Sequence, residues 1–162
     1  MNKNISAICV INENKCKGTI TIKEIMNKTK LEFNINLYDM VPGKHGFHIH
    51  ETGNLIEGCN SCCAHFNPHN KNHGGLHSKE RHLGDLGNII VNSKGKCKMK
   101  IIDKHLKLRG QKYNIIGRSI VVHDKADDLG LGGDKESLIT GNAGARLVCA
   151  VIGYKNAYGI EV

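Results

Sequence analysis

Eight short β-rich segments, several of which alternate apolar with polar side chains, constrain the fold more than any other feature of this chain. They cover residues 5–11, 16–22, 30–37, 45–50, 86–92, 97–103, 118–123 and 146–153. A period of two gives a β-strand one buried and one exposed face, whereas no stretch shows the period of an amphipathic helix. The sequence therefore predicts an all-β protein, an eight-stranded Greek-key barrel or sandwich.

Two long segments, 51–84 and 124–145, break this pattern and are rich in Gly, Asn, His and charged residues. Loops of this length in a compact domain are usually functional or disordered. The 162 residues show no composition break and no internal repeat. We therefore expect a single domain, 1–162, that carries two functional loops.

The formal net charge is +8, from 23 basic and 15 acidic residues. Such a surface is either simply solvated or attracts a small anion or nucleic acid. The chain has no Trp, four Tyr and three Phe, so it lacks the clustered aromatic side chains on which bases stack. We expect no nucleic-acid partner.

No apolar run approaches the ~20 residues of a membrane span. The first residues have a minimal apolar core and no small-residue cleavage site after it, which favours a first β-strand over a signal peptide. We expect no membrane partner and a cytoplasmic location. The composition is rich in Lys, Ile and Asn, and for a viral chain the expected location is the host cytoplasm or the virion.

His48 and His50 stand two residues apart in a predicted strand, so their imidazoles share one face. Two such imidazoles can reach a single metal ion. The alternative, one surface histidine and one core histidine, holds for most isolated pairs of this kind. His123 ends the apolar segment 118–123, and by itself it would be an ordinary strand-end histidine.

The first long loop adds three histidines, His65, His73 and His82, and the carboxylate of Asp85 follows directly after it. Three imidazoles and one carboxylate make a plausible tetrahedral Zn²⁺ site, and the neighbouring glycines allow the loop to fold back sharply. A polar, histidine-rich loop without a metal is the alternative. The remaining histidines are expected at surface or structural positions: His45, His69, His77 and His105.

Taken together, these motifs resemble those of the copper/zinc superoxide dismutases. Gly-Phe-His-Ile-His-Glu at 46–51 and Gly-Asn-Ala-Gly-Ala-Arg-Leu-Val-Cys at 141–149 resemble the two signatures of that family. Between them, His-Phe-Asn-Pro at 65–68, His-Gly-Gly at 73–75, His82-x-x-Asp85 and the segment 123–130 match in order and in type. The resemblance covers essentially the whole chain.

The resemblance implies one copper and one zinc ion per subunit. Copper would be bound by His48, His50, His65 and His123. Zinc would be bound by His65, His73, His82 and Asp85, so that His65 bridges the two ions. The implied activity is the disproportionation of superoxide to O₂ and H₂O₂ by alternate reduction and oxidation of copper. His65 would be the proton donor. The alternative is a non-catalytic copper-binding or copper-delivery module on the same fold.

Other positions match family residues with supporting roles. Asp127 would link the copper ligand His48 to the zinc ligand His73. Arg146 would guide the superoxide anion to copper, and Thr140 would narrow the channel. Cys59 and Cys149 would form the intrachain disulfide. The family also implies a homodimer, whose matching interface positions are Ile5, Gly53, Asn54, Ile116, Gly117, Ile152 and Tyr154.

The chain departs from the family at several positions. Lys135 and Ile139 replace an acid and a lysine of the second long loop, which changes the local field that steers the anion. Ala145 and Leu147 stand where relatives that depend on a dedicated copper chaperone tend to carry proline, so we expect that this partner is not required. Cys62 and Cys63 form a Cys-x-x-Cys-Cys cluster with Cys59, for which a thiol metal site and an accidental role are both open.

Overall fold

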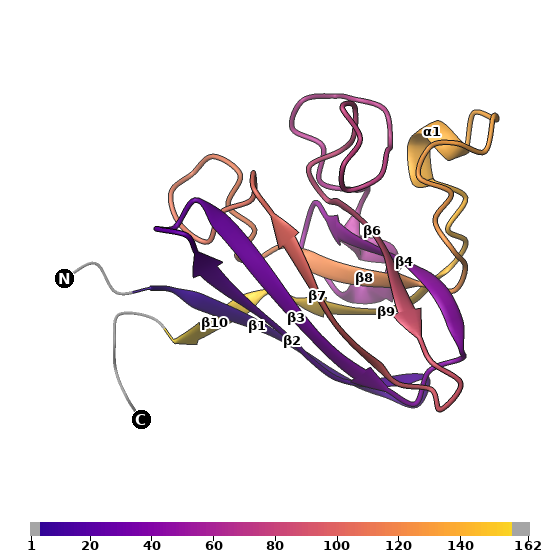
Figure 1. Ribbon diagram of the computed structural model, residues 1–162, viewed down its shortest axis with the longest axis horizontal. Helices are drawn as coiled ribbons and strands as arrows, with labels where there is room; N and C mark the ends of the chain where they lie inside the picture. Colours follow the sequence, from indigo (N-terminus) through magenta and orange to yellow (C-terminus); the bar gives the residue numbers. More distant parts are fainter. Residues whose placement is uncertain (1–3, 157–162) are drawn as a thin grey trace.

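A computed structural model describes residues 4–156 and arranges nine of its ten strands in two antiparallel sheets (Figure 1). The first sheet has the order β10-β1-β2-β3-β7 and the second β6-β4-β8-β9. The strands of the first sheet are β1 (Ser6–Glu13), β2 (Cys16–Ile25), β3 (Lys30–Tyr38), β7 (Cys97–Asp103) and β10 (Gly153–Asn156). Those of the second are β4 (Gly43–His50), β6 (Asp85–Val91), β8 (Ser119–His123) and β9 (Arg146–Val151).

The predicted all-β fold is confirmed, with two short strands that the sequence did not reveal. The segment expected as one strand over 146–153 divides at Ile152 into β9 and β10, which belong to different sheets. The side chain of Ile152 is fully buried, and β10 pairs with β1. The other addition, β5 (Ile56–Cys59), lies in the first long loop and leads into a 3₁₀ turn at Asn60–Cys62.

The core lies between the two sheets and follows from the alternation. Along β3, Leu31, Phe33, Ile35 and Leu37 are buried, while the residues between them are half-buried or exposed. Ile35 pairs with Ile20 of β2 in the neighbouring strand, so the apolar side chains of adjacent strands share the inner face. Among the described residues, no helix has the length and apolar character needed to cross a bilayer.

Strand β4 departs from this alternation because both of its faces are covered. Phe47 and Ile49 are buried in the apolar core, and His48 and His50, on the opposite face, are buried as well. The two long loops lie on that opposite side, and Figure 1 shows the magenta loop that follows β4 beside the orange loop that carries α1 (Ser137–Thr140). The backbone N–H of His73 donates to the carbonyl of Leu138 at 2.8 Å, which joins the two loops.

Candidate metal centre

Four histidines from three parts of the chain meet above β4. His48 and His50 come from β4 itself, and His123 ends the neighbouring strand β8. His65 comes from the first long loop and pairs with His50 through an isolated β-bridge. One ring nitrogen of each of these buried residues lies within 4.8 Å of one from every other member. We call these four residues the histidine group.

The histidine group is oriented by hydrogen bonds at its outer ring nitrogens. His48 Nε2 lies 2.6 Å from Asp127 Oδ2, and His50 Nδ1 lies 2.8 Å from the Cys63 carbonyl. His123 Nδ1 lies 3.2 Å from the Gly144 carbonyl. The opposite nitrogens are buried and have no hydrogen-bond partner in the structure of residues 4–156: His48 Nδ1, His50 Nε2 and His123 Nε2.

Buried polar atoms without partners are costly, and imidazole nitrogens are good ligands for copper. Burial, together with the neighbouring His65, lowers the pKa of His48 to about 3 and that of His50 to about 2. Burial also lowers the pKa of His123 to about 4. These imidazoles are therefore neutral at physiological pH, with free lone pairs, and the group fits a copper ion.

A second group surrounds one oxygen of Asp85, at the start of β6, and we call it the zinc group. Asp85 Oδ1 lies 2.9 Å from His65 Nδ1, 3.0 Å from His73 Nδ1 and 3.2 Å from His82 Nδ1. His82 Nδ1 lies 3.3 Å from His65 Nδ1. A tetrahedral Zn²⁺ ion with bonds of about 2.0 Å separates its ligand atoms by about 3.3 Å. The spacing of these atoms therefore fits zinc.

His73 Nδ1 supports the same interpretation. This nitrogen lies 3.0 Å from Asp85 Oδ1 but makes no hydrogen bond. That is expected if both atoms are acceptors whose lone pairs point to a common metal ion. The other oxygen of Asp85 accepts the backbone N–H groups of Gly74 and His82 at 3.0 and 2.8 Å. Because His65 Nδ1 belongs to this group, its Nε2 is the nitrogen left for the histidine group.

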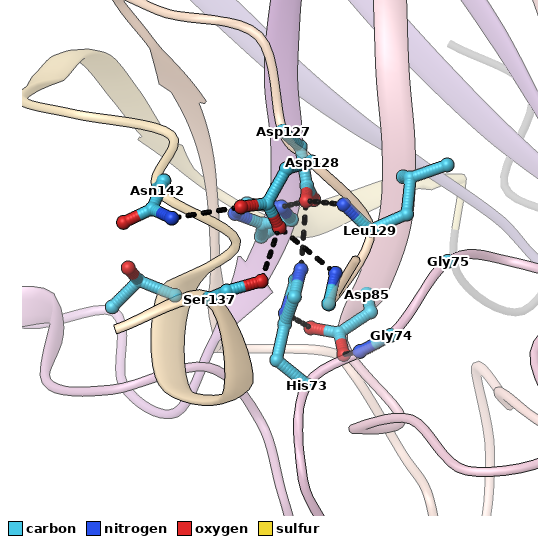
Figure 2. A network of polar contacts seen from close by, with 12 residues as sticks. His73, Gly74, Gly75, Asp85, Asp127, Asp128, Leu129, Ser137 and Asn142 are labelled. Carbon is cyan, nitrogen blue, oxygen red and sulfur yellow. Dashed lines mark hydrogen bonds and ion pairs between the residues drawn. The ribbon is translucent and has the colours of Figure 1, made fainter. Parts of the chain in front are cut away.

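Asp127 connects the two groups. Its Oδ2 accepts from His48 Nε2 and its Oδ1 lies 2.8 Å from His73 Nε2; Figure 2 shows the His73 ring between the carboxylates of Asp127 and Asp85. Burial alone would raise the pKa of Asp127, but the hydrogen bonds from His48 and His73 outweigh it and lower that pKa to about 2. An ionised Asp127 keeps the protons of both rings on their outer nitrogens.

The loop that carries Asp127 is anchored by its neighbour. Asp128 accepts a hydrogen bond from Ser137 Oγ at 2.7 Å and one from Asn142 Nδ2 at 2.8 Å, contacts that Figure 2 also shows. The backbone N–H of Leu129 donates to Asp127 Oδ1 at 2.7 Å. The second long loop is therefore held in the conformation that aims Asp127 at the two imidazoles.

A cavity of about 370 Å³ opens onto the histidine group. Arg146 lines it, and its guanidinium donates to the carbonyls of Cys59 and Cys63 at 2.7 and 2.6 Å. Thr140 also lines the cavity, and its hydroxyl donates to Glu136 Oε1 at 2.7 Å. The structure thus places the predicted metal ligands in the two groups, Asp127 in contact with both groups, and Arg146 and Thr140 on the wall of the cavity.

Two residues that contribute to the site were not predicted from the sequence. The first is Lys125, which lines the cavity. Its position only two residues after His123 could have indicated that it lies near the metal centre. The carbonyl of Cys63 holds both His50 and Arg146. Its position depends on a backbone with φ 63° and ψ −155°, which no side-chain pattern reveals.

A disulfide joins Cys59 and Cys149, the pair that the resemblance implies. It links the end of β5 to β9 and lies in a small buried cluster with Cys62 and Val121. Cys62 is buried with a free thiol and Cys63 is exposed. Within the described residues, no group of side chains close enough to bind a metal contains a cysteine.

Comparisons with known proteins agree with this geometry. The family model described as copper/zinc superoxide dismutase matches residues 16–152. A superoxide dismutase [Cu-Zn] of Paramecium bursaria Chlorella virus 1 is 55% identical over 95% of this chain and 81% of its own length. Superoxide dismutase [Cu-Zn] 5 of Dictyostelium discoideum is 49% identical over 91% of this chain and 97% of its own. The crystal structure of the clock protein EA4 superposes with a TM-score of 0.87 at 39% identity, covering 91% of this chain and 93% of that one.

Proposed function

Because this chain belongs to the copper/zinc superoxide dismutase family of oxidoreductases, we propose a specific role for each residue of its metal centre. Its activity is the disproportionation of superoxide to O₂ and H₂O₂. We assign one copper ion to His48, His50, His65 and His123, and one zinc ion to His65, His73, His82 and Asp85. The observation that carries this assignment is the set of four buried ring nitrogens that lack a partner, of which three belong to the histidine group and the fourth, His73 Nδ1, belongs to the zinc group.

When bound, copper supplies the two oxidation states that accept and return one electron, and zinc supplies a fixed positive charge on the far nitrogen of His65. His65 Nε2 would take up a proton from water when it is not bonded to copper, and would give that proton to the product peroxide. His65 Nδ1 stays on the side of Asp85, so the ring cannot turn away during this transfer. Asp127 keeps the His48 ring oriented from outside.

Arg146 binds the substrate anion. The backbone carbonyls of Cys59, Asn60 and Cys63 hold its guanidinium, and the side chain lines a cavity that is also lined by His50, His65 and His123. A guanidinium fixed in this way attracts and hydrogen-bonds superoxide. Lys125 adds positive charge at the same cavity, and Thr140 limits its width.

We also propose a single domain that assembles as a homodimer. Of the expected interface positions, Tyr154 is 43% exposed, and Val151, which was not among them but lies beside Gly53, is 38% exposed, which supports a symmetric apolar contact. Ile152 is fully buried within one chain, so it would contribute through its backbone alone. A cytoplasmic location, and maturation without a dedicated copper chaperone, stay predictions.

The test is catalysed superoxide decay by protein loaded with copper and zinc, with both metals quantified. We expect a rate constant near the diffusional ceiling of about 10⁸–10⁹ M⁻¹s⁻¹.

Arg146→Gln should lower this rate constant about tenfold or more, because charge-assisted hydrogen bonds are strong. Lys15→Gln makes the same change in net charge at an exposed turn and should have little effect. Normal metal content with no catalysis would favour the copper-delivery alternative, which the named relatives do not support.

A further inference from the structure

A second cavity, of about 630 Å³, lies apart from the metal centre and shares no lining residue with the first one. Its walls come from two segments that are distant in the sequence. Residues 69–83 of the first long loop supply Lys71 and Lys79, and the segment after β7 supplies Lys104 and His105. We call this space the lysine cavity.

A buried ion pair joins the two walls. Arg81 Nη2 lies 2.6 Å from Asp103 Oδ2, and the two side chains are 8% and 1% exposed. The other oxygen of Asp103 accepts the backbone N–H groups of His105 and Leu106, each at 2.7 Å. Asp103 is therefore paired with Arg81, and it does not line the lysine cavity.

The other charged side chains that line the lysine cavity are all positive. No ion pair found within residues 4–156 involves Lys71, Lys79 or Lys104. No Asp or Glu lines the cavity. Like charges gathered around one concave space repel each other, and a bound anion would remove that repulsion.

The lining also supplies uncharged hydrogen-bonding groups and few apolar side chains. Three imidazoles line the cavity, and His69 Nε2 lies 2.7 Å from the Tyr113 hydroxyl, which bridges the two walls. Apart from the Tyr113 ring, Leu76 and Leu83 are the only apolar side chains in the lining that the structure describes. This composition favours a compact, strongly charged ligand over an apolar one.

We propose that the lysine cavity binds a short polyphosphate chain, either free or as part of a nucleotide. The positive charges stand on two separate walls, and several linked phosphates can contact both walls at once. The volume is within the range of small-ligand sites. Because the segment 69–83 also holds the zinc ligands His73 and His82, occupancy would stabilise the loop that carries them.

The proposal is tested by calorimetric titration of the metal-loaded protein at fixed ionic strength, with tripolyphosphate, ATP and adenosine as probes. We expect one site for tripolyphosphate and for ATP and none for adenosine. The triple variant Lys71→Gln/Lys79→Gln/Lys104→Gln should weaken binding about tenfold or more, because each lost contact to a phosphate is charge-assisted. Lys104→Gln alone, the milder variant, should weaken it by a smaller factor.

The matched control is Lys15→Gln/Lys94→Gln/Lys96→Gln, which removes the same charge from exposed turns. Lys94 and Lys96 precede β7, whereas Lys104 follows it, so these two control sites lie at the other end of that strand; Lys15 lies between β1 and β2 and does not line the cavity. We expect the control to bind as the unaltered protein does. Equal weakening by both triple variants would reduce the effect to general charge attraction and overturn the proposal. Tripolyphosphate binding at many sites, or none, would also overturn it.

Discussion

At the scale of single residues, Cys63 combines an unfavourable backbone with a central position. Its φ of 63° and ψ of −155° fall in a region that is essentially restricted to glycine. Its carbonyl nevertheless accepts from both His50 and Arg146. The side chain is exposed, so packing does not compensate for the strain. The geometry of the anion site therefore depends on a peptide group held in a costly conformation.

We expect Cys63→Gly to raise the free energy of unfolding of the metal-loaded protein by about 1 kcal/mol. Relief of the strain is worth about 1–3 kcal/mol, and the extra entropy of an unfolded glycine offsets part of it. Chemical denaturation measures the change. Cys63→Ala, which removes the thiol and keeps the strain, is the matched control and should give no such gain. A gain of equal size in both variants would assign the effect to the thiol.

Asp127 is the residue on which both groups depend. In Asp127→Asn the side chain keeps one acceptor oxygen, so either His48 or His73 faces an NH₂ group instead. We expect metal affinity to fall about 10–100-fold, as measured by competition with a chelator. Asp128→Asn makes the same charge change in the same loop without a contact to an imidazole. It should retain the metals better, and equal losses would contradict the proposed linking role.

At the scale of elements, an ion pair fastens β2 to the long connection before β8. Arg109 Nε and Nη2 lie 2.7 and 2.5 Å from the two oxygens of Glu24, whose side chain is 3% exposed. Burial alone would raise the pKa of Glu24, but the hydrogen bonds from Arg109 and the Ile5 backbone outweigh it, and the pKa lies below its usual range. The folded protein therefore binds fewer protons at Glu24 than the unfolded chain does.

This pair should make stability depend on pH with a defined sign. Its contribution is fully present above the unfolded pKa of Glu24, near 4.5, and is lost as pH falls through the lower folded pKa. We expect Glu24→Gln to cost about 1–3 kcal/mol at pH 7, and the difference from the unaltered protein should shrink below about pH 4.5. Glu32→Gln, whose lysine partners are exposed, should cost less than about 1 kcal/mol.

At the scale of elements, some features of the fold and of the site could be predicted from the sequence and others could not. Eight strands were predictable because each is a short β-rich segment, and in most of them, such as β3, alternation records which face is buried. The division of 146–153 at Ile152 was not, since both halves alternate and only the pairing of β10 with β1 separates them. Among site residues, those with diagnostic side chains were predictable. The role of the Cys63 carbonyl depends on the local backbone conformation, which leaves no pattern in the sequence. The lysine cavity depends on how the fold brings together exposed side chains from two distant segments, which also leaves no pattern in the sequence.

At the scale of the whole molecule, the second sheet and the first long loop meet at polar atoms that have no partners of their own. Four buried ring nitrogens are unpaired in the described structure, and the zinc group joins the first long loop to β6. Metal ligands that connect separate elements couple binding to folding. Stability should therefore depend on the metals throughout the molecule.

We expect chelation to lower the midpoint of thermal unfolding, measured by calorimetry, and zinc to restore most of it. A metal present at 1,000 times its dissociation constant adds about 4 kcal/mol to the free energy of unfolding. Asp85→Asn should show a smaller response to zinc, because the shared oxygen at the centre of the zinc group loses its charge. An identical midpoint with and without metals would contradict this prediction.

Strand β4, covered on both faces, also determines how much sequence change this protein tolerates. From His45 to His50 every residue is buried, and even Gly46 has no room, since an added Cβ would lie 2.8 Å from that of Ala143. In a saturation library selected for superoxide resistance, β3 should show intolerant and permissive positions in alternation. The last six residues of β4 should form an unbroken intolerant block. This strand would then be the slowest to diverge among descendants of the gene.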